Sequence, residues 1–373
     1  MKVHVYAYSD LRYDPRILKQ CRLLIELGYD VSFFGVKFAG SAPCSEVSSC
    51  DFFRRAHTLK TQVLQYFLFV LHMSYVSFQL PKKPCLVIVH NMPNFLSLGT
   101  WFYRVLQVPV VMDLHDDSLL VLGSRVKNSL TLRLISFIEM NVALRFADHI
   151  ITVNSAMKDR ICRFVCSEKV STIHNAPDFY HQTARQITKP LREDVIRLVY
   201  VGNLGEQFGV IEFIEMFDRL GDMVNCRLEL DIWGGGRLEG LLADEIIRLG
   251  LADRVLLRGR YTPEELPSIL DAYDFGIAVY NKNPLSDILL PVKVLEYVSC
   301  GIPVISSRIN TLLDYFPEDC LFYYRDISDI VVALSSSRED VDEKVERSRD
   351  ILDSISWERE KLVFKSLVEK VIH

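Results

Sequence analysis

The stretch DILLPVKVLEYVSCGIPVISS, residues 287–307, decides the fold class of this chain. A helical segment, VKVLEYVSC, begins after Pro291 and runs into Gly301. Proline suits the first turn of a helix, and glycine suits its end. A short β-branched run, IPVISS, follows directly. A helix that turns at a glycine into a buried strand is a repeating unit of a parallel sheet.

The same unit recurs along the whole chain. The expected strands of the front half are VHVYAY, VSFFGV, CLVIVH, VPVVMDL, HIITV and VSTIH; those of the back half are IRLVYVG, RLELDIWG, RVLLRG, FGIAVY, IPVISS and CLFYY. Two such strings predict an α/β protein with two Rossmann-like, doubly wound sheets. In the first unit, Asp14 is expected to cap a helix, Pro15 to occupy its first turn and Gly28 to end it.

The polar segment TARQITKPLRED, residues 183–194, predicts a linker between two domains. We expect a first domain over 1–182, a second over 183–355 and a C-terminal helix over 356–373. A chain of 373 residues can form two full cores. Doubly wound sheets bind ligands at the carboxyl ends of their strands, so the expected site is the cleft between the domains.

Composition narrows the class of protein. Hydrophobic residues make up 49% and charged residues 24%, which argues against a disordered chain. Nine cysteines without CxxC pairs, and no leader that resembles a secretory signal, predict reduced thiols and a cytoplasmic protein. The same cysteine pattern disfavours zinc. Nucleic acid is not among the expected partners.

The charge is divided unevenly. Residues 1–180 contain 20 Lys and Arg against 14 Asp and Glu, whereas the rest of the chain contains 23 against 34. A basic front half suggests an anionic partner, such as a membrane surface. The plain alternative is that the acidic surplus, as in SREDVDEKVERSRD at 337–350, is simply solvated surface.

The segment TQVLQYFLFVLHMSYVSFQLP, residues 61–81, contains no charged residue. Its length would span a bilayer. Its interior polar residues and its place between strands of one sheet favour a buried helix instead. The alternative is a helix whose aromatic face rests in a membrane interface, with the protein peripheral on the inner face of a membrane. The flanking basic residues, which would suit anionic lipid, are Arg54, Arg55, Lys60, Lys82 and Lys83.

A lysine and a glutamate occupy the start of the helix in the opening stretch. Lys293 lies in the first turn and opposes the helix dipole, so stability alone would not favour it. The free N–H groups of a helix N-terminus form a phosphate site, which a lysine strengthens. Glu296, one turn further on, can accept hydrogen bonds from a ribose diol. The pair predicts a nucleotide site; the alternative is a surface ion pair at helical spacing.

Glycine-rich turns follow two expected strands, in YVGNLGEQFGVIEFIEMF at 200–217 and DIWGGGRLEGLL at 231–242. Gly202, Gly205 and Gly209 would allow a phosphate to approach the backbone closely. Ordinary strand-to-helix turns have the same composition, so these turns alone do not establish a nucleotide site.

Acidic residues and histidines end two strands of the front half. VVMDLHDDS places Asp113, His115, Asp116 and Asp117 at one strand end, and VHNMPN places His90 at the previous one. A histidine there could bind a sugar hydroxyl or a phosphate. A metal site is a weaker alternative, because no second cluster of ligands is evident, and His90 is interpreted as structural.

Several motifs, in order along nearly the whole chain, resemble the retaining glycosyltransferases of family 4, which have the GT-B fold of two Rossmann-like domains facing a central cleft. VVMDLHDD resembles the YDxHD segment of the family, and RFADHIITVNSAMKDRI with VSTIHNAPD resembles the region that closes the first domain. YVGNLGEQFGV, LDIWGGGRLEGLL and PVKVLEYVSCGIPVI follow in the family's order. SWERE, at 356–360, is similar to the start of the final helix.

The resemblance implies a donor, a UDP- or GDP-sugar, bound by the back domain, and a glycan or lipid-linked acceptor bound by the front domain. It implies no bound metal and no other cofactor. The residues it assigns are Glu296 for the ribose; Lys293 with Pro291 and Val292 for the diphosphate; Gly202 and Asn203 near the diphosphate; Arg260 and Tyr261 for the base; His115 near the transferred sugar; and Asn175 at the end of the first domain. Of these, His115, Lys293 and Glu296 are the expected catalytic residues.

The chain departs from the family's pattern at Ile288, Asn203 and Phe208, where the family has a glutamate, an arginine and a lysine. The leading hypothesis is a retaining hexosyl- or related glycosyltransferase that acts in surface polysaccharide or glycolipid synthesis. Because of these departures, a second hypothesis is a non-catalytic subunit that binds a nucleotide sugar. A sugar-nucleotide epimerase on the same fold is a third hypothesis, and a nicotinamide enzyme is disfavoured because no GxGxxG follows the first strand.

Overall fold

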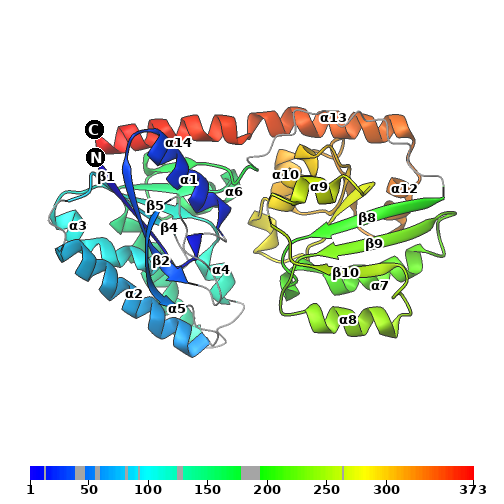
Figure 1. The fold of residues 1–373 in the computed structure, drawn as a ribbon, viewed down its shortest axis with the longest axis horizontal. Helices are drawn as coiled ribbons and strands as arrows, with labels where there is room; N and C mark the ends of the chain where they lie inside the picture. The colour runs from blue at the N-terminus through cyan, green and yellow to red at the C-terminus, as the bar shows by residue number, and fades with distance from the viewer. Residues whose placement is uncertain are drawn as a thin grey trace. The chain divides into compact units, whose positions relative to one another are not determined.

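The computed structural model describes residues 1–11, 14–37, 47–54, 59–79, 83–90, 93–123, 129–177, 194–262 and 264–373. It divides into two compact α/β units (Figure 1). Unit 1 comprises Met1–Asn175 and Glu358–His373, and unit 2 comprises Ala176–Trp357. The expected boundary at 182/183, and all of the expected linker except Asp194, lie outside the described residues.

Unit 1 contains a parallel sheet of the order β3-β2-β1-β4-β5-β6-β7. Its strands are β1 (Lys2–Ala7), β2 (Asp30–Lys37), β3 (Ser48–Arg54), β4 (Leu86–His90), β5 (Val110–Leu114), β6 (His149–Thr152) and β7 (Val170–Thr172). Every residue of the central strands β4 and β5 is buried. This explains their almost continuous apolar sequence, because helices cover both faces of such a sheet.

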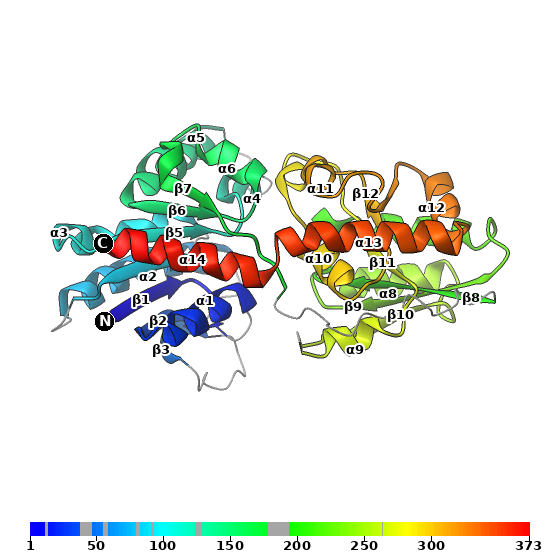
Figure 2. The same cartoon turned by 90° about the horizontal axis from the view of Figure 1, so that it is seen from above.

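The helices of unit 1 lie on both faces of this sheet. They are α1 (Pro15–Glu26), α2 (Leu59–Gln79), α3 (Trp101–Val105), α4 (Ser118–Gly123), α5 (Ser129–Phe137), α6 (Ser155–Ile161) and α14 (Trp357–Ile372), with the 3-10 helix η2 (Asn94–Thr100) before α3. Figures 1 and 2 show α1 and α14 on one side of the sheet, with α2 on the other. The expected cap of α1 is confirmed, since the Asp14 side chain accepts a hydrogen bond from Ile17 N at 3.3 Å.

Unit 2 contains a second parallel sheet, of the order β10-β9-β8-β11-β12-β13. Its strands are β8 (Val195–Val201), β9 (Arg227–Trp233), β10 (Val255–Gly259), β11 (Phe275–Ala278), β12 (Val304–Ser307) and β13 (Phe322–Tyr324). Its helices are α7 (Val210–Leu220), α8 (Glu239–Arg248), α9 (Leu266–Leu270), α10 (Val292–Ser299), α11 (Asn310–Tyr315), α12 (Ile327–Leu334) and α13 (Arg338–Ser354). Two hydrophobic clusters, one on each face, hold the helices to the sheet.

Every strand predicted from the sequence is present, and the α/β fold class is confirmed. The strand that sequence analysis missed is β3, SSCDFFR, at one edge of the first sheet. Its residues are mostly exposed, so it lacks the apolar run by which the buried strands were recognised.

The uncharged segment at 61–81 forms most of α2. The prediction of a buried helix holds for one face only: Phe69, Met73 and Ser77 are buried, whereas the opposite face is exposed. In the part of the chain that the structure describes, none of the helices combines the length and the apolar character needed to cross a membrane.

Candidate functional site

Three neighbouring strands of unit 2 end in glycine turns at the same edge of the sheet. Gly202 N donates to Trp233 O at 2.9 Å, and Gly234 N donates to Gly259 O at 2.7 Å. Gly202 and Gly234 have φ of +130° and +137°, a region that other residues rarely adopt. A Cβ on Gly234 would lie 1.8 Å from Gly202 O, so these turns need glycine to pack together.

Lys293 lies in the first turn of α10, beside these turns. Its side chain is only 8% exposed, and its Nζ lies 3.7 Å from the centre of the Tyr200 ring. The rings of Phe208 and Tyr280 are 5.2 and 5.4 Å from the same atom. The alternative of a surface ion pair with Glu296 is therefore wrong, because the ammonium is enclosed by aromatic rings.

The Lys293 ammonium is buried and makes no hydrogen bond within the described residues. Burial lowers its pKa to about 7, although the nearby charge of Glu296 opposes this shift. Ring faces attract a cation but do not accept its three hydrogen bonds fully. Because buried polar groups are normally paired, this ammonium is a candidate for binding an anion.

The other residues predicted for the diphosphate lie around this lysine or near it. A Cβ added to Gly202 would lie 3.3 Å from Lys293 Nζ. Pro291 is the N-cap of α10 and gives no side-chain cap, and Val292 is the first helical residue. Asn203 is exposed, and its carbonyl oxygen accepts a hydrogen bond from the Tyr200 hydroxyl at 2.9 Å.

The residues predicted for the nucleoside lie at the same edge of the sheet. Burial raises the pKa of Tyr261, and the charge of Glu296 acts in the same direction. Arg260 is exposed, and a Cβ added to Gly235 would lie 3.0 Å from Arg260 Nε. The structure therefore groups Gly202, Lys293 and Glu296 near the ends of β8, β9 and β10.

Sequence analysis missed Asp287, in the short helix η7 (Ser286–Ile288) that precedes α10. One of its carboxylate oxygens, Oδ1, is buried and has no hydrogen-bond partner among the described residues. The position that resemblance aligned with the family's first glutamate is the next residue, Ile288. The sequence feature that could have identified Asp287 is a carboxylate one residue before the position aligned with the family's glutamate.

Unit 1 contains a second cluster, built from the ends of β4 and β5. His90 Nδ1 lies 3.0 Å from His115 Nε2 and 3.5 Å from Asp113 Oδ2. The Asp113 carboxylate is fully buried; Arg16 donates to both of its oxygens at 2.9 and 3.0 Å, and Gln20 donates at 2.6 Å. His90 is buried and connects Asp113 to His115, and its Nε2 has no hydrogen-bond partner among the described residues.

The electrostatics of this cluster favour a neutral histidine beside a charged carboxylate. Burial lowers the pKa of His90 to about 3, an effect that Asp113 opposes. Burial alone would raise the pKa of Asp113, but the Arg16 guanidinium and the two histidines hold it well below its usual range. Each neutral histidine carries a single ring N–H, so in the 3.0 Å contact one ring nitrogen donates and the other accepts.

The atoms of His90, Asp113 and His115 lie close enough together to hold a metal ion. The Asp113 carboxylate, however, is already bound by a guanidinium that neutralises its charge. This donor set fits a hydrogen-bond network better than a cation site.

Further acidic residues surround His115, which is 19% exposed. Its Nδ1 lies 4.0 Å from Asp14 Oδ2. Burial raises the pKa of Asp116, an effect that His115 opposes. Asp117 is buried and pairs with Arg160. Asn175, half-buried, is the last residue of the first segment of unit 1.

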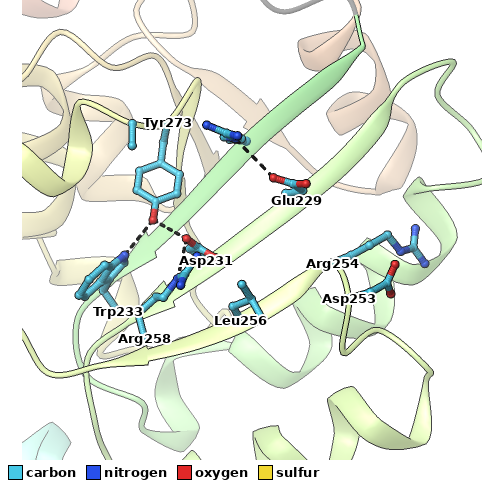
Figure 3. A pocket seen from close by; sticks show the side chains of 10 residues that line it. Glu229, Asp231, Trp233, Asp253, Arg254, Leu256, Arg258 and Tyr273 are labelled. Carbon is cyan, nitrogen blue, oxygen red and sulfur yellow. Dashed lines mark hydrogen bonds and ion pairs between the residues drawn. The ribbon is translucent and has the colours of Figure 1, made fainter.

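A cavity of about 370 Å³ lies on the sheet of unit 2, over β8, β9 and β10 (Figure 3). Asp231 accepts hydrogen bonds from the Tyr273 hydroxyl at 2.5 Å and from Arg258 Nε at 2.9 Å. The other charged residues that line the cavity also form ion pairs, as Arg197 does with Glu229 at 3.4 Å. Because the charged residues that line it are paired, this cavity is a weaker candidate for a charged ligand than the region of Lys293.

Two family models match the chain. The model described as Glycosyltransferase Family 4 matches residues 16–179, and the model described as Glycosyl transferases group 1 matches residues 196–340. A chitobiosyldiphosphodolichol beta-mannosyltransferase of Debaryomyces hansenii is 22% identical over 350 residues, which cover 83% of this chain and 73% of the relative. The corresponding enzyme of Candida albicans is 23% identical over 340 residues, with 82% and 72% covered.

Solved structures show the same fold. A sucrose-phosphate synthase from Thermosynechococcus elongatus superposes with a TM-score of 0.73 at 16% identity, covering 99% of this chain and 98% of that one. The lipopolysaccharide outer core galactosyltransferase WaaB superposes with a TM-score of 0.66 at 16% identity, covering 99% of both chains. With its front half matching one glycosyltransferase model and its back half another, the chain belongs to the family 4 and group 1 glycosyltransferases of the GT-B fold.

Proposed function

We propose that this glycosyltransferase moves a sugar from a nucleoside-diphosphate sugar to a lipid-linked or glycan acceptor, without a bound metal. The observation that carries the proposal is the buried Nζ of Lys293, which has no hydrogen-bond partner among the described residues. It lies beside the Gly202 turn and at the start of α10, where backbone N–H groups also favour an anion.

The chemistry follows from the charge that develops during the reaction. As the glycosidic bond breaks, negative charge accumulates on the leaving diphosphate. A fixed ammonium and a helix N-terminus aimed at that charge stabilise the transition state. Glu296 would accept hydrogen bonds from the ribose, and Arg260 and Tyr261 would contact the base. With Lys293 as the positive charge, the diphosphate does not need a metal ion.

In unit 1 we assign His115 to the transferred sugar. His90 and Asp113 fix the orientation of its ring through the 3.0 Å contact between the two histidines. The acceptor is assigned to unit 1 as well. The curated relatives are named for a chitobiosyldiphosphodolichol acceptor, and this supports a lipid-linked acceptor for the present chain.

The stereochemistry of transfer has two versions. In the retaining version the leaving diphosphate takes the acceptor proton and the enzyme needs no base. The curated relatives are named beta-mannosyltransferases, and this name supports the inverting version. There, a basic group of unit 1 would deprotonate the acceptor, and we propose Asp14 or Asp116, near His115, for this role. The anomeric configuration of the product, compared with that of the donor by NMR, distinguishes the two.

The donor site is tested by thermal unfolding with UDP, GDP, ADP, CMP and NAD. A ligand that binds only the native state stabilises it by RT ln(1 + [L]/Kd), about 2.7 kcal/mol at 100 times Kd. We expect UDP or GDP to raise the Tm of the wild type but not of Lys293→Ala or Glu296→Ala. Lys282→Ala, which removes an exposed lysine of unit 2, should respond as the wild type does.

If no nucleotide raises the Tm, the donor site is wrong. If a nucleoside diphosphate binds but no donor is turned over with any lipid-linked or glycan acceptor, the non-catalytic subunit becomes the better hypothesis. Conversion of the nucleotide sugar in the absence of acceptor would identify an epimerase.

A further inference from the structure

The helix α2 exposes a row of large apolar side chains. Its members are Val63, Leu64, Phe67, Leu71, Tyr75 and Phe78, which are 43–73% exposed. At about 100° per residue they occupy an arc of roughly 120° on one side of the helix. The other side packs Phe69 and Met73 into the core of unit 1. A helix at the surface of a globular protein normally carries polar residues on its outer face, and α2 carries apolar residues on both faces.

The short helix α3 extends this row. Trp101 is 50% exposed and Val105 is 66% exposed. The Trp101 indole N–H donates to Ser74 Oγ of α2 at 3.0 Å, and the Phe78 and Phe102 rings lie 5.5 Å apart. These contacts join the two helices into one surface. We call it the apolar face; it consists of Val63, Leu64, Phe67, Leu71, Tyr75, Phe78, Trp101 and Val105.

Positive charge prevails in the sequence around the apolar face, although Arg104 of α3 pairs with Asp148. Residues 52–112, which contain α2, η2 and α3, include six Lys and Arg but no Asp or Glu. The carbonyl oxygen of Arg54 accepts a hydrogen bond from Gln65 of α2 at 2.8 Å. Lys83 Nζ donates to the carbonyl oxygen of Leu106, just after α3, at 3.2 Å. Basic residues therefore flank the apolar face on both helices.

Apolar side chains with tryptophan and tyrosine among them, bordered by lysine and arginine, match the surface of a negatively charged bilayer. The apolar groups enter the boundary between headgroups and acyl chains, while the basic groups attract the anionic headgroups. A second copy of this chain would bring the same positive charge against itself, which opposes self-association through this face.

We propose that the apolar face docks unit 1 on the surface of an anionic lipid bilayer. The inference rests on the proposed function for its purpose, since a lipid-linked acceptor is presented at a bilayer surface. Its evidence is independent of that function, because it consists of the exposed side chains of α2 and α3 and of the basic residues beside them.

The test is flotation of the full chain with lipid vesicles, with neither donor nor acceptor present. We expect the wild type to float with vesicles that contain phosphatidylglycerol, and to do so at least ten times less with pure phosphatidylcholine or at high salt. Phe67→Gln with Phe78→Gln should reduce flotation at least tenfold. The matched control, Leu241→Gln with Val332→Gln, replaces two equally exposed apolar residues of unit 2 and should float as the wild type does.

The Tm shift with the nucleotide that binds the wild type is measured for each variant. We expect each variant to show the same Tm shift as the wild type. This result would show that the variants fold and that the substitutions do not affect the donor site. The proposal is overturned if the wild type does not float, if it floats equally with neutral vesicles, or if the α2 variant floats undiminished. It is also overturned if the wild type is a dimer in size-exclusion chromatography and the α2 variant is a monomer, since a second copy would then cover this face.

Discussion

The ammonium of Lys293 lies 3.7 Å from the centre of the Tyr200 ring, so an aromatic face rather than a carboxylate holds this cation. Phe208, where the family resemblance leads one to expect a lysine, forms part of the same aromatic wall. Rings provide attraction without neutralising the charge. The lysine, when protonated, therefore lacks a compensating carboxylate and can pair with an anionic ligand.

The pKa of Lys293 predicts that nucleotide binding depends on pH. The ordinary pKa of 10.5 is lowered to about 7, so the free protein holds this lysine mostly neutral above pH 7. A bound diphosphate favours the charged form, so binding takes up a proton, and Kd should rise by up to about tenfold per pH unit above 7. Calorimetry at about pH 8, in buffers of different ionisation enthalpy, measures the uptake.

The matched variant for this prediction is Lys293→Arg. A guanidinium stays charged at this pH, so proton uptake should disappear even if some affinity remains. Equal proton uptake by wild type and variant would assign the effect to another group and contradict the prediction.

Gly202 is predicted to tolerate no side chain. Gly202→Ala places a Cβ 3.3 Å from Lys293 Nζ at a backbone φ of +130°. We expect the free energy of unfolding to fall by about 1–3 kcal/mol because of the strained backbone. We also expect nucleotide affinity to fall, because the lysine must move.

Gly240→Ala is the control, since no atom lies within 4 Å of the added Cβ and alanine favours the helix by about 0.5–1 kcal/mol. Urea unfolding and calorimetry measure both effects, and equal losses in the two variants would argue against the role of Gly202.

The sequence predicted the strands well because parallel strands buried on both faces are recognisable as apolar runs. It predicted the place of Lys293 from its position after Pro291, but not its burial, since the enclosing rings of Tyr200 and Tyr280 come from β8 and from the end of β11. Such contacts depend on how strands pair, which sequence spacing does not contain.

The connection between His90 and His115 was missed for the same reason. His90 ends β4 and His115 directly follows β5; the parallel register of the two strands pairs His90 with Asp113, which brings His115 near His90. The edge strand β3 and the two-faced α2 also escaped the local rules, because their outer faces do not follow the usual alternation of apolar and polar residues.

The buried pair of Arg16 and Asp113 is predicted to be essential for the stability of unit 1. Asp113→Asn removes the charge that compensates a guanidinium that is 4% exposed. Loss of one partner of a buried pair typically costs about 3–5 kcal/mol of unfolding free energy. The control is Asp148→Asn, which breaks an exposed pair with Arg104 and should cost about 0–1 kcal/mol. Urea unfolding monitored by fluorescence tests both, and a similar small loss in each would show that the cluster is not held by this pair.

Asp287 is predicted to contact the sugar of the donor rather than the nucleotide. A buried carboxylate oxygen without a partner destabilises the free protein, so its removal by Asp287→Ala should leave the unfolding free energy unchanged or raise it by up to about 1–2 kcal/mol. A sugar hydroxyl would satisfy this oxygen in the complex. The variant should therefore keep the Tm shift with the nucleoside diphosphate but lose the further shift that the nucleotide sugar gives to the wild type.

Asp244→Ala, an exposed position on α8, is the control for charge and should keep both shifts. A variant that loses stability and both shifts together would show that Asp287 supports the start of α10, and the assignment to the sugar would be wrong.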